Sequence, residues 1–255
     1  MFAAEGKFKQ AQAFYAKAIA MDRALGPAAG LNEAVSLGNV ARLRFRQGAY
    51  AEAEAGLRDA IARKQRLLGT DYDDNGRSYD RDSLAEVLIA RGQFDEARTL
   101  AEGALAEARR RHREAHPDAA FALTVEAELM AATGARASAA ALVGSAVAMY
   151  AALADQNSEK AIRARLLFGE ILQTLGRNGE AKPQLQAALA AADRMAPTTP
   201  ALVAHAETDL ARANASLGES VAADRLRKDA KVPLAAIEAG PNAERDATAR
   251  LLEQE

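Results

Sequence analysis

The chain has 255 residues, with 33 Lys and Arg against 35 Asp and Glu, so its formal net charge is −2. This near-neutral balance argues against a non-specific nucleic-acid binder, which needs a basic surface. The absence of cysteine excludes a disulfide framework, a thiol nucleophile and a cysteine-ligated zinc, but it does not identify the redox compartment. With 66 alanines, 27% charged residues and no tryptophan, the composition favours helices throughout and argues against β-sandwiches and barrels.

The N-terminal residues 1–7 lack a charged start followed by an apolar run, so we expect no signal peptide and a cytoplasmic location. Residues 137–154 form an uncharged stretch of 18 residues, which reaches the lower length limit of a membrane-spanning helix. This stretch is mostly Ala, Ser and Gly, which gain little from lipid, and it falls in register with a repeat. We therefore predict a buried helix of the repeat array and no membrane partner.

A short motif recurs along most of the chain. A glycine is followed two residues later by a variable, often aromatic residue and five residues later by an alanine. The glycines are separated by 42, 44, 42, 42 and 42 residues. They are Gly6, Gly48, Gly92, Gly134, Gly176 and Gly218. Further small residues keep the same register, seven residues before and twelve residues after the glycines, which indicates an internal repeat.

The repeat predicts a helical hairpin. Each glycine can adopt the backbone conformation that ends one helix and lets the next begin, and the small residues allow two antiparallel helices to approach closely. Large apolar residues recur at helical spacing, five residues before and thirteen residues after the glycine, as Leu43 and Ile61 do around Gly48. One hairpin cannot bury this apolar face alone, so the hairpins must stack on one another.

These repeats resemble tetratricopeptide repeats, in particular the long-period type of kinesin light chains and many bacterial multidomain proteins. The resemblance rests on Asn39-Val40-Ala41, Gly48-x-Tyr50-x-x-Ala53-x-x-x-Leu57-x-x-Ala60-Ile61 and Leu68-Gly69, with linkers Leu25-Gly26-Pro27 and His116-Pro117-Asp118. It covers about residues 6–231 and implies an all-α, right-handed α-solenoid of stacked antiparallel helix pairs. Glu126 departs from the pattern at an apolar position, and the last three glycine turns lack the aromatic residue.

The register predicts the organisation of the chain. We expect a half repeat over residues 6–30 and a C-terminal tail or short capping helix over residues 232–255. Five full repeats lie between them, over about 31–73, 74–117, 118–157, 158–199 and 200–231. In the last repeat, Arg227 and Lys231 stand where leucines stood one repeat earlier, which is typical of the polar outer face of a capping helix.

The first repeat has only its second helix, about residues 9–24, so an apolar face with Phe14, Tyr15 and Ile19 lacks a cover. We therefore expect the chain to be a piece of a larger protein. The richness in Ala and Arg suggests a GC-rich coding genome and a bacterial source. Self-association through the uncovered N-terminal helix is a further expectation.

The sequence contains no glycine-rich phosphate loop, no Gly-x-Ser-x-Gly and no His-Glu-x-x-His motif. No acid, base and nucleophile set converges, so we expect neither catalysis nor a cofactor. His112 and His116, four residues apart, could hold a metal from one helix face. However, Pro117 places His116 at or beyond the helix end, so we favour a solvated helix terminus and expect no metal.

One acidic segment has the spacing of a calcium loop, with Gly76 at the position of the sharp turn. Its candidate ligands are Asp71, Asp73, Asn75 and Asp82. The final aspartate is shorter than the usual bidentate glutamate, and Ser78 replaces an apolar residue, so a solvated inter-repeat connection is the preferred interpretation. The basic run at residues 109–113 is similarly interpreted as the C-terminus of a helix, where cations are favourable, with a phosphate or nucleic-acid patch as the alternative.

In the resembling family, the first helix of each pair lines a concave groove that binds an extended peptide or a partner helix. The residue six positions before each glycine is expected to face this groove. These residues are Arg42, Glu86, Glu128, Glu170 and Arg212. Neighbouring candidates are Asn39, Phe45, Arg46, Tyr79, Asp82, Phe121, Thr124, Arg163, Leu167, Gln173 and His205. Asn39 matches the backbone-clamping asparagine of the family, and Arg42 with Arg46 resembles part of a carboxylate clamp.

The resemblance implies a non-enzymatic scaffold with a protein or peptide partner and no nucleic acid. Glu86, Glu128 and Glu170, which we call the acidic ladder, would select a basic segment of that partner by charge complementarity. A second interpretation is that these charges only keep a concave face soluble. The alternative function is a regulatory or sensor segment of a signalling protein, whose kinase or caspase-like protease effector lies outside this chain.

Overall fold

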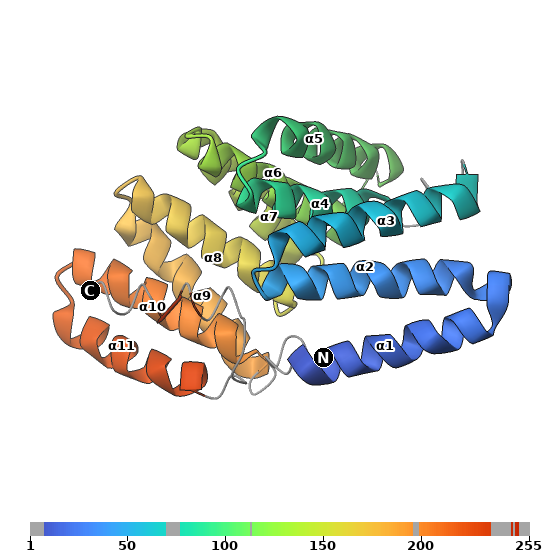
Figure 1. Cartoon of the computed structure of the whole chain (residues 1–255). Helices are drawn as coiled ribbons and strands as arrows, with labels where there is room; N and C mark the ends of the chain where they lie inside the picture. Colours follow the sequence, from blue (N-terminus) through green and yellow to red (C-terminus); the bar gives the residue numbers. More distant parts are fainter. Residues whose placement is uncertain are drawn as a thin grey trace.

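The computed structural model describes residues 8–69, 77–112, 114–195, 199–235, 246 and 248–249, and within them the chain is all-α (Figure 1). The elements in chain order are α1 (Phe8–Ala24), η1 (Gly26–Ala29), α2 (Gly30–Arg46), α3 (Tyr50–Leu68), α4 (Arg77–Ala90), α5 (Phe94–Arg111), α6 (Pro117–Ala132), α7 (Arg136–Ala152), α8 (Glu159–Thr174), α9 (Asn178–Met195), α10 (Pro200–Ser216) and α11 (Ser220–Ala235). The predicted helical repeat solenoid is confirmed.

The helices form antiparallel pairs that stack into a curved array (Figure 1). The pairs are α2 with α3, α4 with α5, α6 with α7, α8 with α9 and α10 with α11. Successive first helices contact one another, from α2 to α10, whereas no two second helices do so among the described residues. The array is therefore compressed along its first helices and splayed along its second helices. We call the face lined by α2, α4, α6, α8 and α10 the inner face.

The five described glycine turns share one backbone geometry. Gly48, Gly92, Gly134, Gly176 and Gly218 all have positive φ values, between 72° and 92°. In each turn the glycine N–H donates to the carbonyl three residues earlier, and the following N–H donates to the carbonyl five residues before it, as in Gly92 to Ile89 (2.9 Å) and Gln93 to Leu88 (2.9 Å). This double hydrogen bond closes the first helix and requires a left-handed residue. The predicted role of the glycines is confirmed for these five turns.

The small residues lie where the paired helices approach. The alanines five and twelve residues after each described glycine are all fully buried. They are Ala53, Ala60, Ala97, Ala104, Ala139, Ala146, Ala181, Ala188, Ala223 and Ala230. A Cβ placed on Gly56 of α3 would lie 2.8 Å from the Cβ of Ala41 on α2, so these backbones leave no room for larger side chains.

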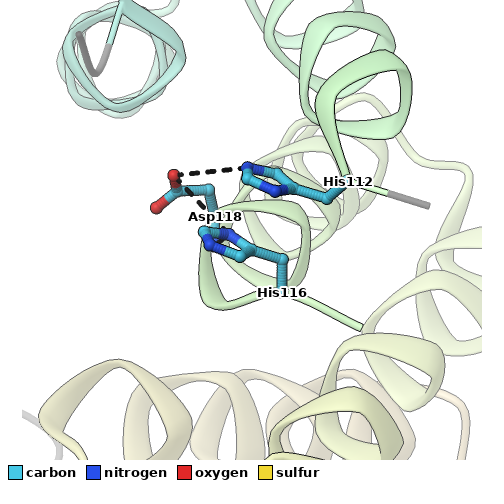
Figure 2. A group of neighbouring side chains, drawn as sticks. All are labelled: His112, His116 and Asp118. Atoms are coloured by element: carbon cyan, nitrogen blue, oxygen red, sulfur yellow. Dashed lines mark hydrogen bonds and ion pairs between the residues drawn. The ribbon is translucent and has the colours of Figure 1, made fainter. Parts of the chain in front are cut away.

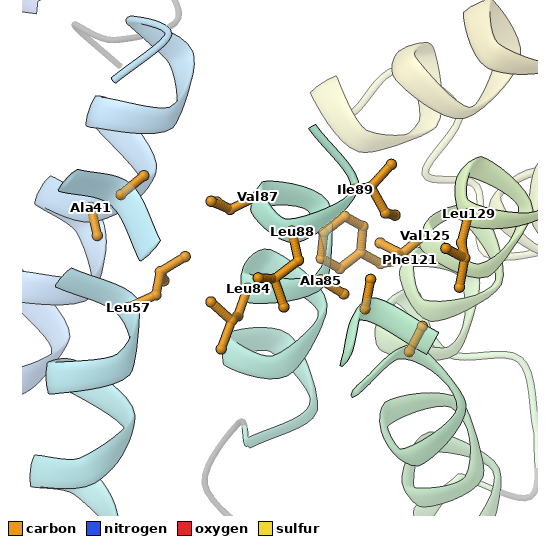
Figure 3. Close-up of a cluster of buried hydrophobic side chains, with 13 residues drawn as sticks. Ala41, Leu57, Leu84, Ala85, Val87, Leu88, Ile89, Phe121, Val125 and Leu129 are labelled. Atoms are coloured by element: carbon orange, nitrogen blue, oxygen red, sulfur yellow. The ribbon is translucent and has the colours of Figure 1, made fainter. Parts of the chain in front are cut away.

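The hydrophobic core is continuous from one repeat to the next. Its first cluster joins α2 through α6, and Figure 3 shows Leu57, Leu88 and Phe121 from three successive repeats converging in it. Further clusters join α6, α7 and α8, and then α8, α9 and α10. Each hairpin therefore buries its apolar face against its neighbours, as a solenoid requires.

The uncharged stretch at residues 137–154 is largely occupied by α7, whose Val143 and Tyr150 are buried against α6 and α8. Across the part of the chain that the structure describes, no helix combines the length and the apolar character needed to cross a membrane. At the N-terminal end, α1 packs Phe8 and Tyr15 against Leu43 of α2, while Phe14 remains 60% exposed. Self-association through this helix stays a prediction.

We expect the Gly169→Ala substitution to destabilise the fold by about 1–3 kcal/mol through overpacking. A Cβ on Gly169 of α8 would lie 2.6 Å from Cγ of the fully buried Leu185 on α9. The matched control is Gly103→Ala on α5, where the nearest atom lies at 3.7 Å and a gain of about 0.5–1 kcal/mol is expected from helix propensity. Urea denaturation compares the two variants, and an equally stable Gly169→Ala protein would contradict this account of the α8–α9 packing.

Candidate binding site on the inner face

Each first helix carries one residue of the predicted series. Arg42 lies on α2 and Arg212 on α10, and the acidic ladder lies between them on α4, α6 and α8. All five side chains are partly buried and partly exposed. The charges of Glu86 and Glu170 both contribute to the raised pKa of Glu128.

Enclosure by the protein changes the ionisation of the acidic ladder. Burial, followed by repulsion from Glu86 and Glu170, raises the pKa of Glu128 to about 8. Burial also raises the pKa of Glu86 to about 7, although Arg163 and Lys160 oppose this effect. The pKa of Glu170 is raised as well, by burial and then by Asp209. At neutral pH the acidic ladder therefore carries fewer than three full negative charges. The spacing of the glutamates in the sequence alone did not reveal this partial protonation.

Two aromatic rings and two cations stack at the α2 side of the inner face. The ring centroids of Tyr79 on α4 and Phe121 on α6 lie 5.5 Å apart. The Lys160 ammonium group, at the start of α8, lies 4.0 Å from the Tyr79 centroid and 4.2 Å from the Phe121 centroid. Arg42 covers the Tyr79 ring at 4.7 Å. Burial lowers the pKa of Lys160, and nearby acids such as Asp118 and Glu86 oppose that effect.

Ion pairs and hydrogen bonds hold the cations of α2 in place. Arg42 Nη2 donates to Asn39 Oδ1 at 2.8 Å, and Arg42 Nη1 lies 3.5 Å from Asp80 Oδ1. Arg46 Nη1 lies 3.2 Å from Glu159 Oε1, an ion pair that joins the end of α2 to the start of α8 (Figure 1). Because α4 and α6 lie between α2 and α8 in the array, this ion pair shows that the inner face curves enough for side chains of non-adjacent repeats to meet.

The α10 side carries a second polar cluster. His205 Nε2 lies 2.8 Å from Glu170 Oε1 and 3.2 Å from Asp209 Oδ2. Asp209 is fully buried and also pairs with Arg212. Gln173 Nε2 on α8 donates to the backbone carbonyl of Asp209 at 2.7 Å. Four sequence-predicted residues thus meet here around Asp209.

Sequence reasoning missed Asp209 and Lys160. Asp209 stands four residues after His205, so both occupy one face of α10, and this spacing was a usable signal. Lys160 of α8 reaches Tyr79 on α4 and Phe121 on α6 because the array is curved, and no local pattern in the sequence encodes this curvature.

The remaining candidates mainly serve packing or local bonding. Phe45 and Leu167 are half-buried against hydrophobic clusters, and Phe121 is itself a core residue. Thr124 Oγ1 donates to the Ala120 carbonyl of its own helix at 2.8 Å. Arg163 Nη2 bonds to Glu159 at 3.2 Å on α8. These side chains therefore contribute to packing and to bonds within the array.

The calcium hypothesis stays a prediction, because Asp71, Asp73 and Asn75 lie outside the described residues. The fourth candidate ligand, Asp82, is fully buried on α4. Neither carboxylate oxygen has a hydrogen-bond partner within the described parts of the chain, and burial raises the pKa of Asp82 well above its usual range.

His112 and His116 do not share a helix face (Figure 2). His112 ends α5, and His116 is the N-cap of α6, where its Nδ1 accepts a hydrogen bond from the Asp118 N–H at 3.2 Å. The predicted helix-terminus position of His116 is confirmed. The two imidazole rings stack, with centroids 3.4 Å apart and an interplanar angle of 2°, beside Asp118.

Comparisons with known proteins agree with this architecture. The model of the tetratricopeptide repeat (TPR) family matches residues 34–74 and 81–118. No curated protein sequence matches the chain. Among solved structures, it is similar to BtubC (BKLC) from P. vanneervenii, with a TM-score of 0.65 and 18% identity over 91% of this chain and 92% of that one.

Two further solved structures resemble the chain. A Podosopora anserina protein with nearly identical TPR-like repeats of a kinesin light chain has a TM-score of 0.59 and 22% identity, over 78% of this chain and 93% of that one. A Rap protein complexed with Competence and Sporulation Factor has a TM-score of 0.71 and 15% identity, over 91% of this chain and 59% of that one. At these identities the likeness concerns the fold.

The raised pKa values predict a pH-dependent stability. A carboxyl whose folded pKa is about 8 holds its proton where the unfolded chain, with a pKa near 4.5, has released it. The free energy of unfolding therefore decreases as pH rises from about 5 to about 8. Glu128→Gln mimics the protonated form, so we expect little effect at pH 5 and a gain of about 1 kcal/mol at pH 8, a modest value because water reaches the side chain.

Urea denaturation at a series of pH values measures this effect. Glu102→Gln on the exposed surface of α5 is the control and should keep the wild-type pH profile. If the Glu128→Gln profile ran parallel to the wild-type profile, the proposed proton uptake at Glu128 on folding would be wrong.

Proposed function

We propose that this chain is a non-enzymatic scaffold whose inner face binds an extended basic segment of a partner protein. The match of residues 34–74 and 81–118 to the tetratricopeptide repeat family and the fold shared with kinesin-light-chain-like repeats support this proposal. The observation that carries this proposal is the acidic ladder, in which three successive repeats each present one carboxylate whose pKa is raised. A regular array of enclosed carboxylates suits a ligand with regularly spaced cations.

The shifted pKa values add a reason why a cation would bind. Ionisation of Glu86 and Glu128 at neutral pH is unfavourable in the folded protein, because their pKa values are about 7 and about 8. A lysine or arginine placed beside them would stabilise the ionised form, lower these pKa values and release protons. Binding should therefore strengthen as pH rises and the ionisation cost disappears.

The Lys160 side chain illustrates the same chemistry within the chain. Its ammonium group lies over Tyr79 and Phe121, where a cation gains from the negative faces of both rings. Nearby acids, including Asp118 and Glu86, also favour the charged form of Lys160. We infer that this position is a cation subsite, which Lys160 occupies in the absence of a partner. The complex between the similarly folded Rap protein and Competence and Sporulation Factor supports a binding role for this kind of array.

Repeat spacing defines a suitable probe. Packed helices lie about 8–10 Å apart, and a polyproline II chain advances about 3.1 Å per residue with three residues per turn, so every third side chain lies on the same face. A peptide with lysine at every third residue therefore offers one cation to each glutamate of the ladder. A peptide of the same composition with its lysines in one block tests whether spacing matters, and a version with glutamate in place of lysine tests the charge.

We expect the fluorescein-labelled peptide with spaced lysines to bind the wild-type protein and to bind more tightly as pH rises from about 6 to about 9. The Glu86→Gln, Glu128→Gln, Glu170→Gln triple variant should lose most of this affinity and its pH dependence. Fluorescence anisotropy measures both quantities.

The matched control is Glu126→Gln, which lies on α6 beside Glu128. Burial also raises its pKa, but its charged neighbours Arg109 and Glu102 lie on α5, away from the inner face. This variant should bind the probe as the wild type does. The proposal fails if the triple variant keeps the wild-type affinity, or if the peptide with glutamates binds equally well.

Removal of the internal cation is a separate prediction. Lys160→Ala should increase the affinity for the spaced-lysine peptide, because it uncovers the rings of Tyr79 and Phe121 and removes a competing charge. Lys182→Ala is the control, since Lys182 of the second helix α9 pairs with Glu219, which directly precedes the second helix α11. Weaker or unchanged binding by Lys160→Ala would contradict the cation subsite at this position.

A further inference from the structure

The cluster at the α10 side of the inner face has features that peptide binding does not require. It brings together one imidazole and two carboxylates from two helices, Glu170 from α8 and His205 and Asp209 from α10. One ligand-type atom from each residue lies within 4.8 Å of the other two. His205 and Asp209 are four residues apart, so both project from the same face of α10 towards α8.

We propose that Glu170, His205 and Asp209 form a binding site for a divalent transition-metal ion, with Zn²⁺ as the best match. One nitrogen and two oxygen donors are ligands that Zn²⁺ accepts, and a tetrahedral ion leaves a fourth position for water. An ion with bonds of about 2.0–2.1 Å holds its ligand atoms about 3.3 Å apart. The His205 Nε2 distances of 2.8 Å to Glu170 and 3.2 Å to Asp209 need to open by only a few tenths of an ångström.

The neighbouring residues already orient these ligands. Asp209 is fully buried, and Arg212 pairs with its Oδ1 atom, which leaves Oδ2 directed at His205. Gln173 on α8 donates to the backbone carbonyl of Asp209 at 2.7 Å, which ties the two helices together at the level of the cluster. Partners of this kind fix metal ligands in place and are a regular part of metal sites.

Electrostatics also favours an ion at this position. Two carboxylates face each other here, and Asp209 is the charged neighbour that most raises the pKa of Glu170. A divalent cation would replace this repulsion by attraction to both groups. Arg212 cancels part of the negative charge, so we expect a dissociation constant in the micromolar range rather than the much tighter binding of a structural zinc site.

The chain provides an internal comparison in His112, His116 and Asp118 (Figure 2). These residues offer two imidazoles, but the rings stack face to face at 3.4 Å, with an interplanar angle of 2°. The nitrogen lone pairs of parallel rings lie in separate planes and cannot both point at one ion. The Nδ1 atom of His116 also accepts the Asp118 N–H as a helix cap. This cluster would have to rearrange before it could bind a metal.

The test is a titration of the full chain with Zn²⁺ by isothermal calorimetry in a weakly coordinating buffer, without any peptide. Co²⁺ binding, followed by its visible absorption, reports the coordination geometry independently. We expect one equivalent to bind the wild type. His205→Gln and Asp209→Asn should each weaken this binding about tenfold or more, and the double variant His112→Gln, His116→Gln should bind as the wild type does.

Circular dichroism of each variant without metal confirms that the helices remain folded. The proposal is overturned if the wild type binds no Zn²⁺ in the micromolar range, if His205→Gln binds as tightly as the wild type, or if only the His112, His116 double variant loses binding. Although Glu170 also belongs to the acidic ladder, the metal titration and the peptide titration are separate measurements. Either proposal can therefore fail without the other.

Discussion

The close approach of paired helices is the constraint on which the rest of the structure depends. A left-handed glycine closes each first helix, and fully buried alanines line both sides of the hairpin. Two backbones can then pack with little side-chain volume between them, so the large apolar side chains are directed towards neighbouring repeats. The continuous core that joins successive repeats follows from this arrangement.

Curvature is a second consequence, and it accounts for the unusual electrostatics. Successive first helices are close enough to touch, so polar side chains on them are surrounded by protein while still reaching water. Carboxylates in such a position keep contact with water but are buried enough to lose much of their hydration, and this burial raises the pKa values of Glu86 and Glu128. The same curvature brings α8 across to α2, where Arg46 meets Glu159.

The two halves of the inner face offer different chemistry on one scaffold. The α2 side combines aromatic rings with cations, around Tyr79 and Phe121. The α10 side combines His205 with acidic residues that are held by Arg212 and Gln173. A repeat fold permits this difference because each first helix contributes its side chains independently, while the glycine and alanine register remains unchanged.

The sequence by itself determined the helix pairs, the glycine turns and the small-residue contacts, because these depend on a register that repeats every 42 to 44 residues. It also placed Glu86, Glu128 and Glu170 at equivalent positions of three successive first helices, since the repeat register relates them to one another. The tertiary structure alone decided which of these residues meet across repeats. The placement of Lys160 over Tyr79, the cluster around Asp209 and the raised pKa values all depend on the angle between stacked hairpins. That angle results from the packing of many side chains at once, and no local pattern in the sequence encodes it.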